Sequence, residues 1–280
     1  MEFLTDPFGA DFVRQAAITA ALVGVLCGVV GCFVLLRGLA LMADSLAHGV
    51  LPGVAIAFMI TANRGGVEPD RLAITLGALV AGLLTAAGTG AILRRSRLGA
   101  DTASAVAFVF MLSLGVVLIS RVEGYAVDLN AFLFGDVLAS DSGDVALSAA
   151  LCAVVLIAVA VLYRPLLLLS FDPKRATALG VRVERIEALL LVLITLAVVA
   201  GFLVVGALLV LGMLLAPPAL GALVAKRLPA MRAVSAGVAA ASAPIGLLLS
   251  WHLDLAAGAS IVLVAVSAFV LTALVRGARA

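Results

Sequence analysis

Apolar runs fill this chain almost from end to end, and they constrain its fold more than any other feature. A helix needs about 20 mainly apolar residues to cross roughly 30 Å of hydrocarbon, and run after run approaches that length. Only 12% of the 280 residues are charged, whereas a soluble domain carries roughly a quarter. No single stretch resembles a signal peptide followed by a soluble body. The sequence therefore predicts an all-α fold, a polytopic transmembrane helical bundle that forms a single domain over residues 1–280.

Charged and turn-forming residues divide the apolar runs into membrane spans. The stretch 188–225 is ambiguous, because only Gly201 and Gly206 mark a turn within it. The predicted number of spans is therefore eight or nine. The candidates lie near 15–36, 39–60, 71–93, 104–121, 144–163, 188–204, 207–225, 232–251 and 257–275.

The basic residues predict which side of the membrane each loop faces. If the loop at 94–103 is cytoplasmic, fourteen of the 18 lysines and arginines lie on that side and only four lie outside. The reverse arrangement would break the positive-inside rule. The C-terminus is therefore predicted to be cytoplasmic.

Two connections are longer than turns. The outer one, at 122–144, combines polar residues with the apolar patch "AFLFG", which suggests a short helix at the outer surface. The inner one, at 164–187, contains a helix start at Asp172–Pro173 and a stop at Gly180. This short helix could cover the end of the bundle or dock a cytoplasmic partner, and its residue pattern does not decide between the two. Its apolar stripe consists of Ala176, Leu179 and Val183.

The second span, at 39–60, carries two ionisable side chains where lipid makes them costly. Counted from Arg37 at the cytoplasmic edge, Asp44 lies roughly 10 Å and His48 roughly 16 Å into the membrane. Residues four apart on a helix share a face and can contact one object. Ionisable groups at this depth usually mark a pathway. The alternative is an internal brace, in which Asp44 and His48 bind each other or Ser45.

The residues that follow His48 support a ligand site. Pro52 has no N–H, so the His48 carbonyl is expected to lose its helical partner, and the proline ring bends the helix. Gly49 and Gly53 allow another helix or a second subunit to approach closely. A carboxylate, an imidazole and this carbonyl suit Mn²⁺, Fe²⁺ or Zn²⁺ better than Cu⁺. Two side-chain ligands do not complete a coordination shell, so other helices or a second copy of the chain must contribute.

The other histidine, His252, lies with Asp254 in "SWHLDLAAGAS" between the last two spans. These residues could be ligands at the outer mouth, where an ion would arrive. They could also be polar caps at a helix end that faces water. The capping role is the plainer interpretation.

Missing motifs exclude several kinds of chemistry. No G-x-x-x-x-G-K-[ST] phosphate loop occurs, so this chain does not bind ATP by that route. The sequence also contains no nucleophile elbow and no HExxH motif, so nothing in it indicates an enzyme. The net charge of +2 comes without a basic face, so no nucleic-acid partner is expected. Close contact with another helix is expected at Gly24 and Gly28. The three cysteines, Cys27, Cys32 and Cys152, are expected to be small buried residues of the core.

The segment "VLLRGLALMADSLAHGVLPGVAIAF" closely resembles the signature of the permease subunits in the ABC-3 family of zinc and manganese importers. The resemblance continues in the family's order and covers nearly the whole chain. Ala43 and Gly38 depart from the commonest pattern, which has a glycine and a basic residue there, but neither change removes a ligand. The further matching blocks are "DTASAVAF", "LNAFLFGDVL", "LLLLSFDPKRATALGV", "VVGALLVLGMLLAPPAL" and "WHLDLAAGASIVLV".

The resemblance implies an assembly in the bacterial plasma (inner) membrane. Two permease copies would form the pathway, two cytoplasmic ATPase subunits would hydrolyse ATP, and an extracytoplasmic metal-binding protein would deliver Zn²⁺ or Mn²⁺. Fe²⁺ is a third candidate, and no cofactor would be bound permanently. Asp44 and His48 match the family's metal site. The family's coupling helix, which contacts the ATPase, is matched by Asp172, Pro173, Ala176, Leu179 and Gly180.

The residues leave one rival from another class of transporter. In a secondary metal–proton exchanger, Asp44 and His48 would carry protons and no ATPase would be needed. An importer of bulky iron chelates or vitamins would not need an ionisable pair at mid-membrane. A structural scaffold would not explain where the pair is placed.

Overall fold

The computed structural model describes residues 11–63, 71–95, 99–121, 138 and 140–277. Within these residues the chain forms helices and no strands, which confirms the predicted all-α class. The helices are α2 (Asp11–Arg37), α3 (Ala40–Gly49), α4 (Leu51–Asn63), α5 (Arg71–Arg95), α6 (Ala100–Ile119), α8 (Ser142–Val161), α9 (Tyr163–Phe171), α10 (Pro173–Ala178), α11 (Val183–Val205), α12 (Ala207–Val224), α13 (Leu228–Leu253) and α14 (Ala257–Gly277).

Nine spans in the described part are long and apolar enough to cross a membrane, and α3 and α4 together form one of them, Ala40–Thr61. The ambiguous stretch 188–225 contains two spans, because α11 ends at Val205 and α12 begins at Ala207. Gly206 between them has a φ of +82°, a conformation that glycine adopts without a steric penalty. The predicted polytopic bundle is therefore confirmed, with nine spans in the part of the chain that is described.

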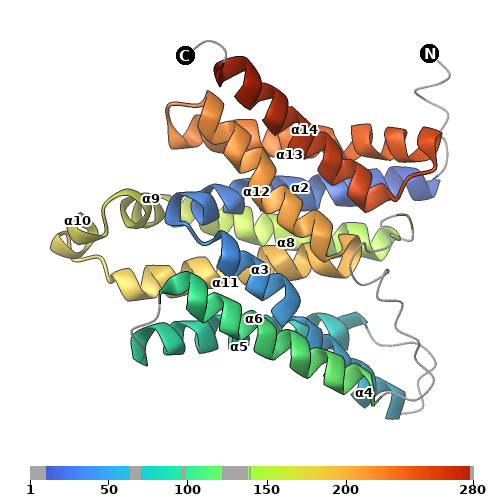
Figure 1. The fold of residues 1–280 in the computed structure, drawn as a ribbon, viewed down its shortest axis with the longest axis horizontal. Helices are drawn as coiled ribbons and strands as arrows, with labels where there is room; N and C mark the ends of the chain where they lie inside the picture. Colours follow the sequence, from blue (N-terminus) through green and yellow to red (C-terminus); the bar gives the residue numbers. More distant parts are fainter. Residues whose placement is uncertain (1–10, 64–70, 96–98, 122–137, 139, 278–280) are drawn as a thin grey trace.

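The first span, α2, runs through the middle of the bundle (Figure 1), where it contacts α8, α11, α12 and α13. Glycines on α2, which have no side chain, allow α13 to approach this helix closely. A Cβ on Gly24 would lie 3.1 Å from the Ala239 carbonyl oxygen, and a Cβ on Gly28 would lie 3.0 Å from that of Ser235. The close helix contact predicted at these glycines is therefore present. The three cysteines that were expected to be small buried residues are free and buried: Cys27, Cys32 and Cys152.

The inner segment at 164–187 folds as most of α9, the short helix α10 and the first turn of α11, at the far left of Figure 1. The Asp172 carboxylate accepts a backbone N–H in the first turn of α10, and Pro173 is the first helical residue. Gly180, with a φ of +79°, follows the helix. The start and stop agree with the sequence prediction. Of the predicted apolar stripe, Ala176 is fully buried, Val183 is half-buried and Leu179 is 63% exposed.

The outer loop predicted at 122–144 lies largely outside the described residues, and only its last part can be placed. Asp144 donates its backbone N–H to Asp141 Oδ1 at 2.9 Å, and Asp141 donates its own to Asp144 Oδ2 at 3.1 Å. This reciprocal pair is a capping box, which satisfies N–H groups at the start of α8. The start of that span is therefore fixed by its N-cap residue and by one side chain of its first turn.

Candidate metal site

The two ionisable side chains of the second span lie side by side on α3. Asp44 Oδ1 and His48 Nε2 are 3.6 Å apart, as expected for residues one helical turn apart. Helix α3 lies inside the bundle, in contact with α5, α6, α11 and α12 (Figure 1). The side chain of His48 is 16% exposed and that of Asp44 is 36% exposed. The carboxylate therefore borders an accessible surface, while the imidazole is largely enclosed.

Contacts with α6 hold the imidazole of His48. Its ring meets that of Phe108 edge to face, with the centroids 5.1 Å apart and an interplanar angle of 79°, an arrangement that aromatic rings favour. The His48 Nδ1 atom is buried and has no hydrogen-bond partner among the described residues. The orientation of the ring therefore depends on Phe108 and on its own helix.

The brace alternative is only partly formed in the structure, because Asp44 and His48 lie within ion-pair distance of each other. At 3.6 Å the contact between Asp44 and His48 is longer than a hydrogen bond. Ser45 is fully buried, and in the described part of the chain its Oγ atom has no hydrogen-bond partner. The pair therefore keeps polar atoms that its neighbours leave unsatisfied.

The second span breaks at Val50, two residues after His48. Helix α3 ends at Gly49 and α4 begins two residues later, with Pro52 in its first turn. Pro52 offers no N–H to the His48 carbonyl, as predicted, and this carbonyl accepts the backbone N–H of Val50 instead. A carbonyl oxygen has two lone pairs, so the His48 oxygen keeps one of them for a further partner. Gly49 makes room for α5, since a Cβ there would meet the Thr85 side chain.

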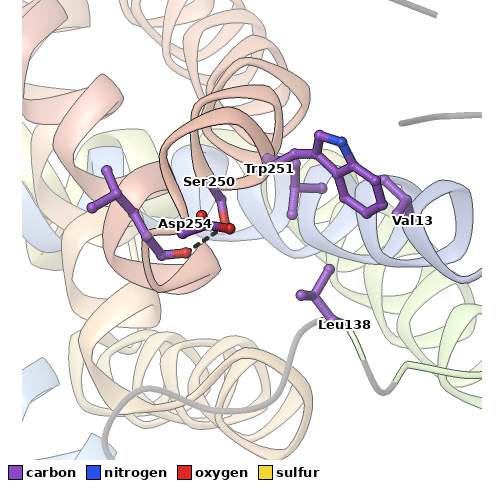
Figure 2. A pocket seen from close by; sticks show the side chains of 7 residues that line it. Val13, Leu138, Ser250, Trp251 and Asp254 are labelled. Atoms are coloured by element: carbon purple, nitrogen blue, oxygen red, sulfur yellow. Dashed lines mark hydrogen bonds between the residues drawn. The ribbon is translucent and has the colours of Figure 1, made fainter. Parts of the chain in front are cut away.

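The residues predicted at the outer mouth, His252 and Asp254, lie at the end of α13, where Figure 2 shows Asp254 near Ser250 and Trp251. Asp254 is the C-cap of this helix, with a left-handed φ of +52°, and it lines a pocket of about 370 Å³. His252 is half-buried in the last turn of the same helix. The Ser250 hydroxyl donates a hydrogen bond to the Leu255 carbonyl at 2.6 Å, which closes the turn. The backbone conformation gives Asp254 the capping position that the sequence suggested.

One chain supplies an incomplete ligand set. Across the described residues, no group of three or more His, Cys, Asp or Glu side chains could hold a metal ion. Two neighbours that the sequence did not indicate are Phe108, which contacts His48, and Thr85, which contacts Gly49. They come from α6 and α5, and no spacing in the sequence relates them to α3.

Apolar spans packed around an ionisable pair define a multi-pass membrane protein of the transporter class. Residues 9–276 match the ABC 3 transport family. The chain belongs to this family, as its sequence motifs predicted, and it is a permease, a multi-pass protein of the bacterial inner membrane.

The similarity covers nearly the full length of the related proteins. The chain is 41% identical over 269 residues to the manganese transport system membrane protein MntC of Halalkalibacterium halodurans, covering 96% of this chain and 89% of that protein. It is 30% identical over 270 residues to a probable iron transport system membrane protein of Haemophilus influenzae, covering 96% of each. The solved structure of PsaBC from Streptococcus pneumoniae in complex with Fab has a TM-score of 0.85 at 36% identity, covering 97% of this chain and 94% of that chain.

Proposed function

We propose that this chain is the permease subunit of an ATP-driven importer of divalent transition-metal ions, and that Asp44 and His48 bind the ion within the pathway. Residues 1–280 then form one permease domain. Its relatives named for manganese and iron transport support Mn²⁺ as the first candidate and Fe²⁺ as the second. The same ligand types also suit Zn²⁺.

The observation that carries this proposal is the separation of Asp44 Oδ1 and His48 Nε2. Two ligands that each lie roughly 2.1 Å from one ion are about 3.4 Å apart in the tetrahedral geometry of Zn²⁺ and about 3.0 Å apart at neighbouring positions of the octahedral geometry that suits Mn²⁺. The observed 3.6 Å exceeds both values by less than about 1 Å, so a small side-chain movement would bring both atoms onto one ion. The partial exposure of Asp44 gives the ion a way to reach the carboxylate.

We infer that two copies of the chain form the pathway. One copy contributes one carboxylate and one imidazole, whereas transition-metal sites usually need four or more ligands. A second copy related by a two-fold axis would double the set to two of each.

The energy for transport would come from two separate ATPase subunits at the cytoplasmic end, and an extracytoplasmic metal-binding protein would deliver the ion. Helix α10 is the contact we propose for the ATPase, because Leu179, which follows it, presents an exposed apolar side chain. Closure of the ATPase pair would move α10, and this movement would alternate access to Asp44 and His48 from the two sides.

Uptake of ⁵⁴Mn²⁺ into proteoliposomes that contain permease, ATPase and binding protein tests the proposal. Asp44→Ala and His48→Ala should each reduce ATP-dependent uptake to background while the complex still assembles. Asp11→Asn is the matched control, because Asp11 is a carboxylate at the exposed outer end of α2. Full uptake by both site variants would refute the site. Uptake by the permease alone, driven by a pH gradient, would refute the ATP-driven function.

A further inference from the structure

Arg37, the last residue of α2, connects three separate parts of the chain at the cytoplasmic end. Its Nη1 atom donates a hydrogen bond to the Leu169 carbonyl in α9 at 3.1 Å. Its Nη2 atom forms an ion pair with the carboxylate of Glu187 in α11. The Arg37 side chain is 20% exposed and that of Glu187 is 46% exposed, so water competes more strongly for the ion pair than for the hydrogen bond to Leu169. A single guanidinium therefore holds the ends of α2, α9 and α11 together.

The connection from Arg37 to the candidate site is short and rigid. Gly38 has a φ of +65°, and Leu39 donates its N–H to the Val34 carbonyl at 2.9 Å, which closes the end of α2. Ala43 in turn donates its N–H to the Leu39 carbonyl at 2.9 Å, so α3 starts without a loop. A displacement of Arg37 therefore reaches Asp44 through ordered backbone.

The other side of the connection leads to α10. The Leu169 carbonyl lies in the last turn of α9, and α10 begins only four residues later, at Pro173. The Leu169 side chain is fully buried, so α9 is anchored in the bundle. Glu187 lies at the start of α11, on the other side of α10 in the chain. Arg37 thus contacts the helices that flank α10 on both sides.

We propose that Arg37 is a positioning residue that makes α3 follow the movement of α9, α10 and α11. It would carry the motion of α10 to Asp44 and His48. This inference rests on the proposed function, in which the ATPase drives α10. The planar guanidinium suits this role because it bonds a carbonyl and a carboxylate at once, which a lysine ammonium on its flexible stem does less well.

Metal uptake per ATP hydrolysed is the first test, measured on the assembled complex in proteoliposomes. Arg37→Gln should lower this ratio about tenfold, as expected when charge-assisted hydrogen bonds are lost, while ATP hydrolysis continues. Glu187→Gln should lower it less, because the bond to Leu169 remains. The exchange Arg37→Glu with Glu187→Arg should restore part of the ratio. The matched control is Arg14→Gln, which breaks the exposed pair with Asp11 on the same helix and should leave the ratio unchanged.

An unchanged ratio in Arg37→Gln would overturn the proposal. A parallel loss of uptake, hydrolysis and assembled complex would also overturn it, because Arg37 would then only support folding.

A second measurement needs no metal and so separates this inference from the proposed function. Spin labels at Leu41→Cys in α3 and Arg182→Cys after α10 occupy exposed positions, whereas the native cysteines are buried. In the otherwise unchanged complex, the distance between the labels should stay constant when nucleotide binds, because the two segments move together. With Arg37→Gln added, nucleotide should shift this distance. A constant distance in both proteins would refute the coupling even if metal uptake depends on Asp44 and His48.

Discussion

Gly53 in α4 and Gly77 in α5 lie backbone to backbone. A Cβ on Gly53 would overlap the carbonyl oxygen of Gly77, and a Cβ on Gly77 would overlap that of Gly53 and lie 3.0 Å from the Cβ of Ala57. Such contacts between small residues let membrane helices approach closely. This crossing fixes α4 immediately after the break that follows His48, so it supports one end of the candidate site.

Gly77→Ala is predicted to destabilise the protein, because the added methyl group has no room at this crossing. Overpacking a well-filled site costs about 1–3 kcal/mol, so the midpoint of thermal unfolding in detergent should fall. Gly88→Ala is the control on the same helix, since a Cβ there meets nothing within 4 Å. The Gly88→Ala variant should have an unchanged or higher unfolding midpoint. Equal midpoints for the two variants would contradict the crossing.

The role of Asp254 in the backbone turn can be tested separately from the role of its charge. Its left-handed φ of +52° should cost a β-branched residue about 1–2 kcal/mol. Asp254→Val should therefore lower the unfolding midpoint, while Asp254→Gly should not. If the residue only caps the helix, Asp254→Gly will also leave metal uptake unchanged. A stable Asp254→Gly protein with impaired uptake would instead indicate a ligand at the outer mouth.

Much of the fold could be predicted from the sequence, because only segments that are long and apolar enough can cross a lipid bilayer as helices. Each apolar run had to become a helix of spanning length, and the observed spans differ from the predicted ones mainly at their ends. Helix α11 begins at Val183, five residues before the predicted 188. Its first turns contain Glu184 and Arg185, and these charged residues led the hydropathy pattern to place the start of the span too late. Long charged side chains at a helix end can reach the membrane interface, so the helix includes them.

Only the part of the candidate site that lies on a single helix could be predicted from the sequence. The spacing of Asp44 and His48 places them on one face wherever α3 lies in the bundle. The contact with Phe108 depends on how α3 and α6 cross. The contacts of Arg37 join residues 132 and 150 positions away. No local sequence pattern contains such information.

Leu179→Asp is predicted to weaken binding of the ATPase. The Leu179 side chain is 63% exposed, and burying a leucine in a partner's groove contributes about 1.5–3 kcal/mol, so its loss should reduce affinity by roughly tenfold or more. Copurification of the ATPase measures this. Leu253→Asp is a matched control, because Leu253 is similarly exposed but lies at the C-terminal end of α13, which is predicted to face the outside. Equal recovery of the ATPase with both variants would argue against docking at α10.

Phe108→Leu is predicted to raise the KM for metal uptake without loss of the assembled complex. The variant keeps an apolar side chain on α6 but removes the edge-to-face contact that holds the His48 ring. Aromatic contacts of this kind contribute about 0.5–1.5 kcal/mol, so the increase should be about two- to tenfold. Phe110→Leu is the control two residues along the same helix, where the side chain is 61% exposed. Because Phe110 faces away from the interior, its replacement should leave KM unchanged. If both variants behaved like the unmodified protein, His48 would not need Phe108 to hold its orientation.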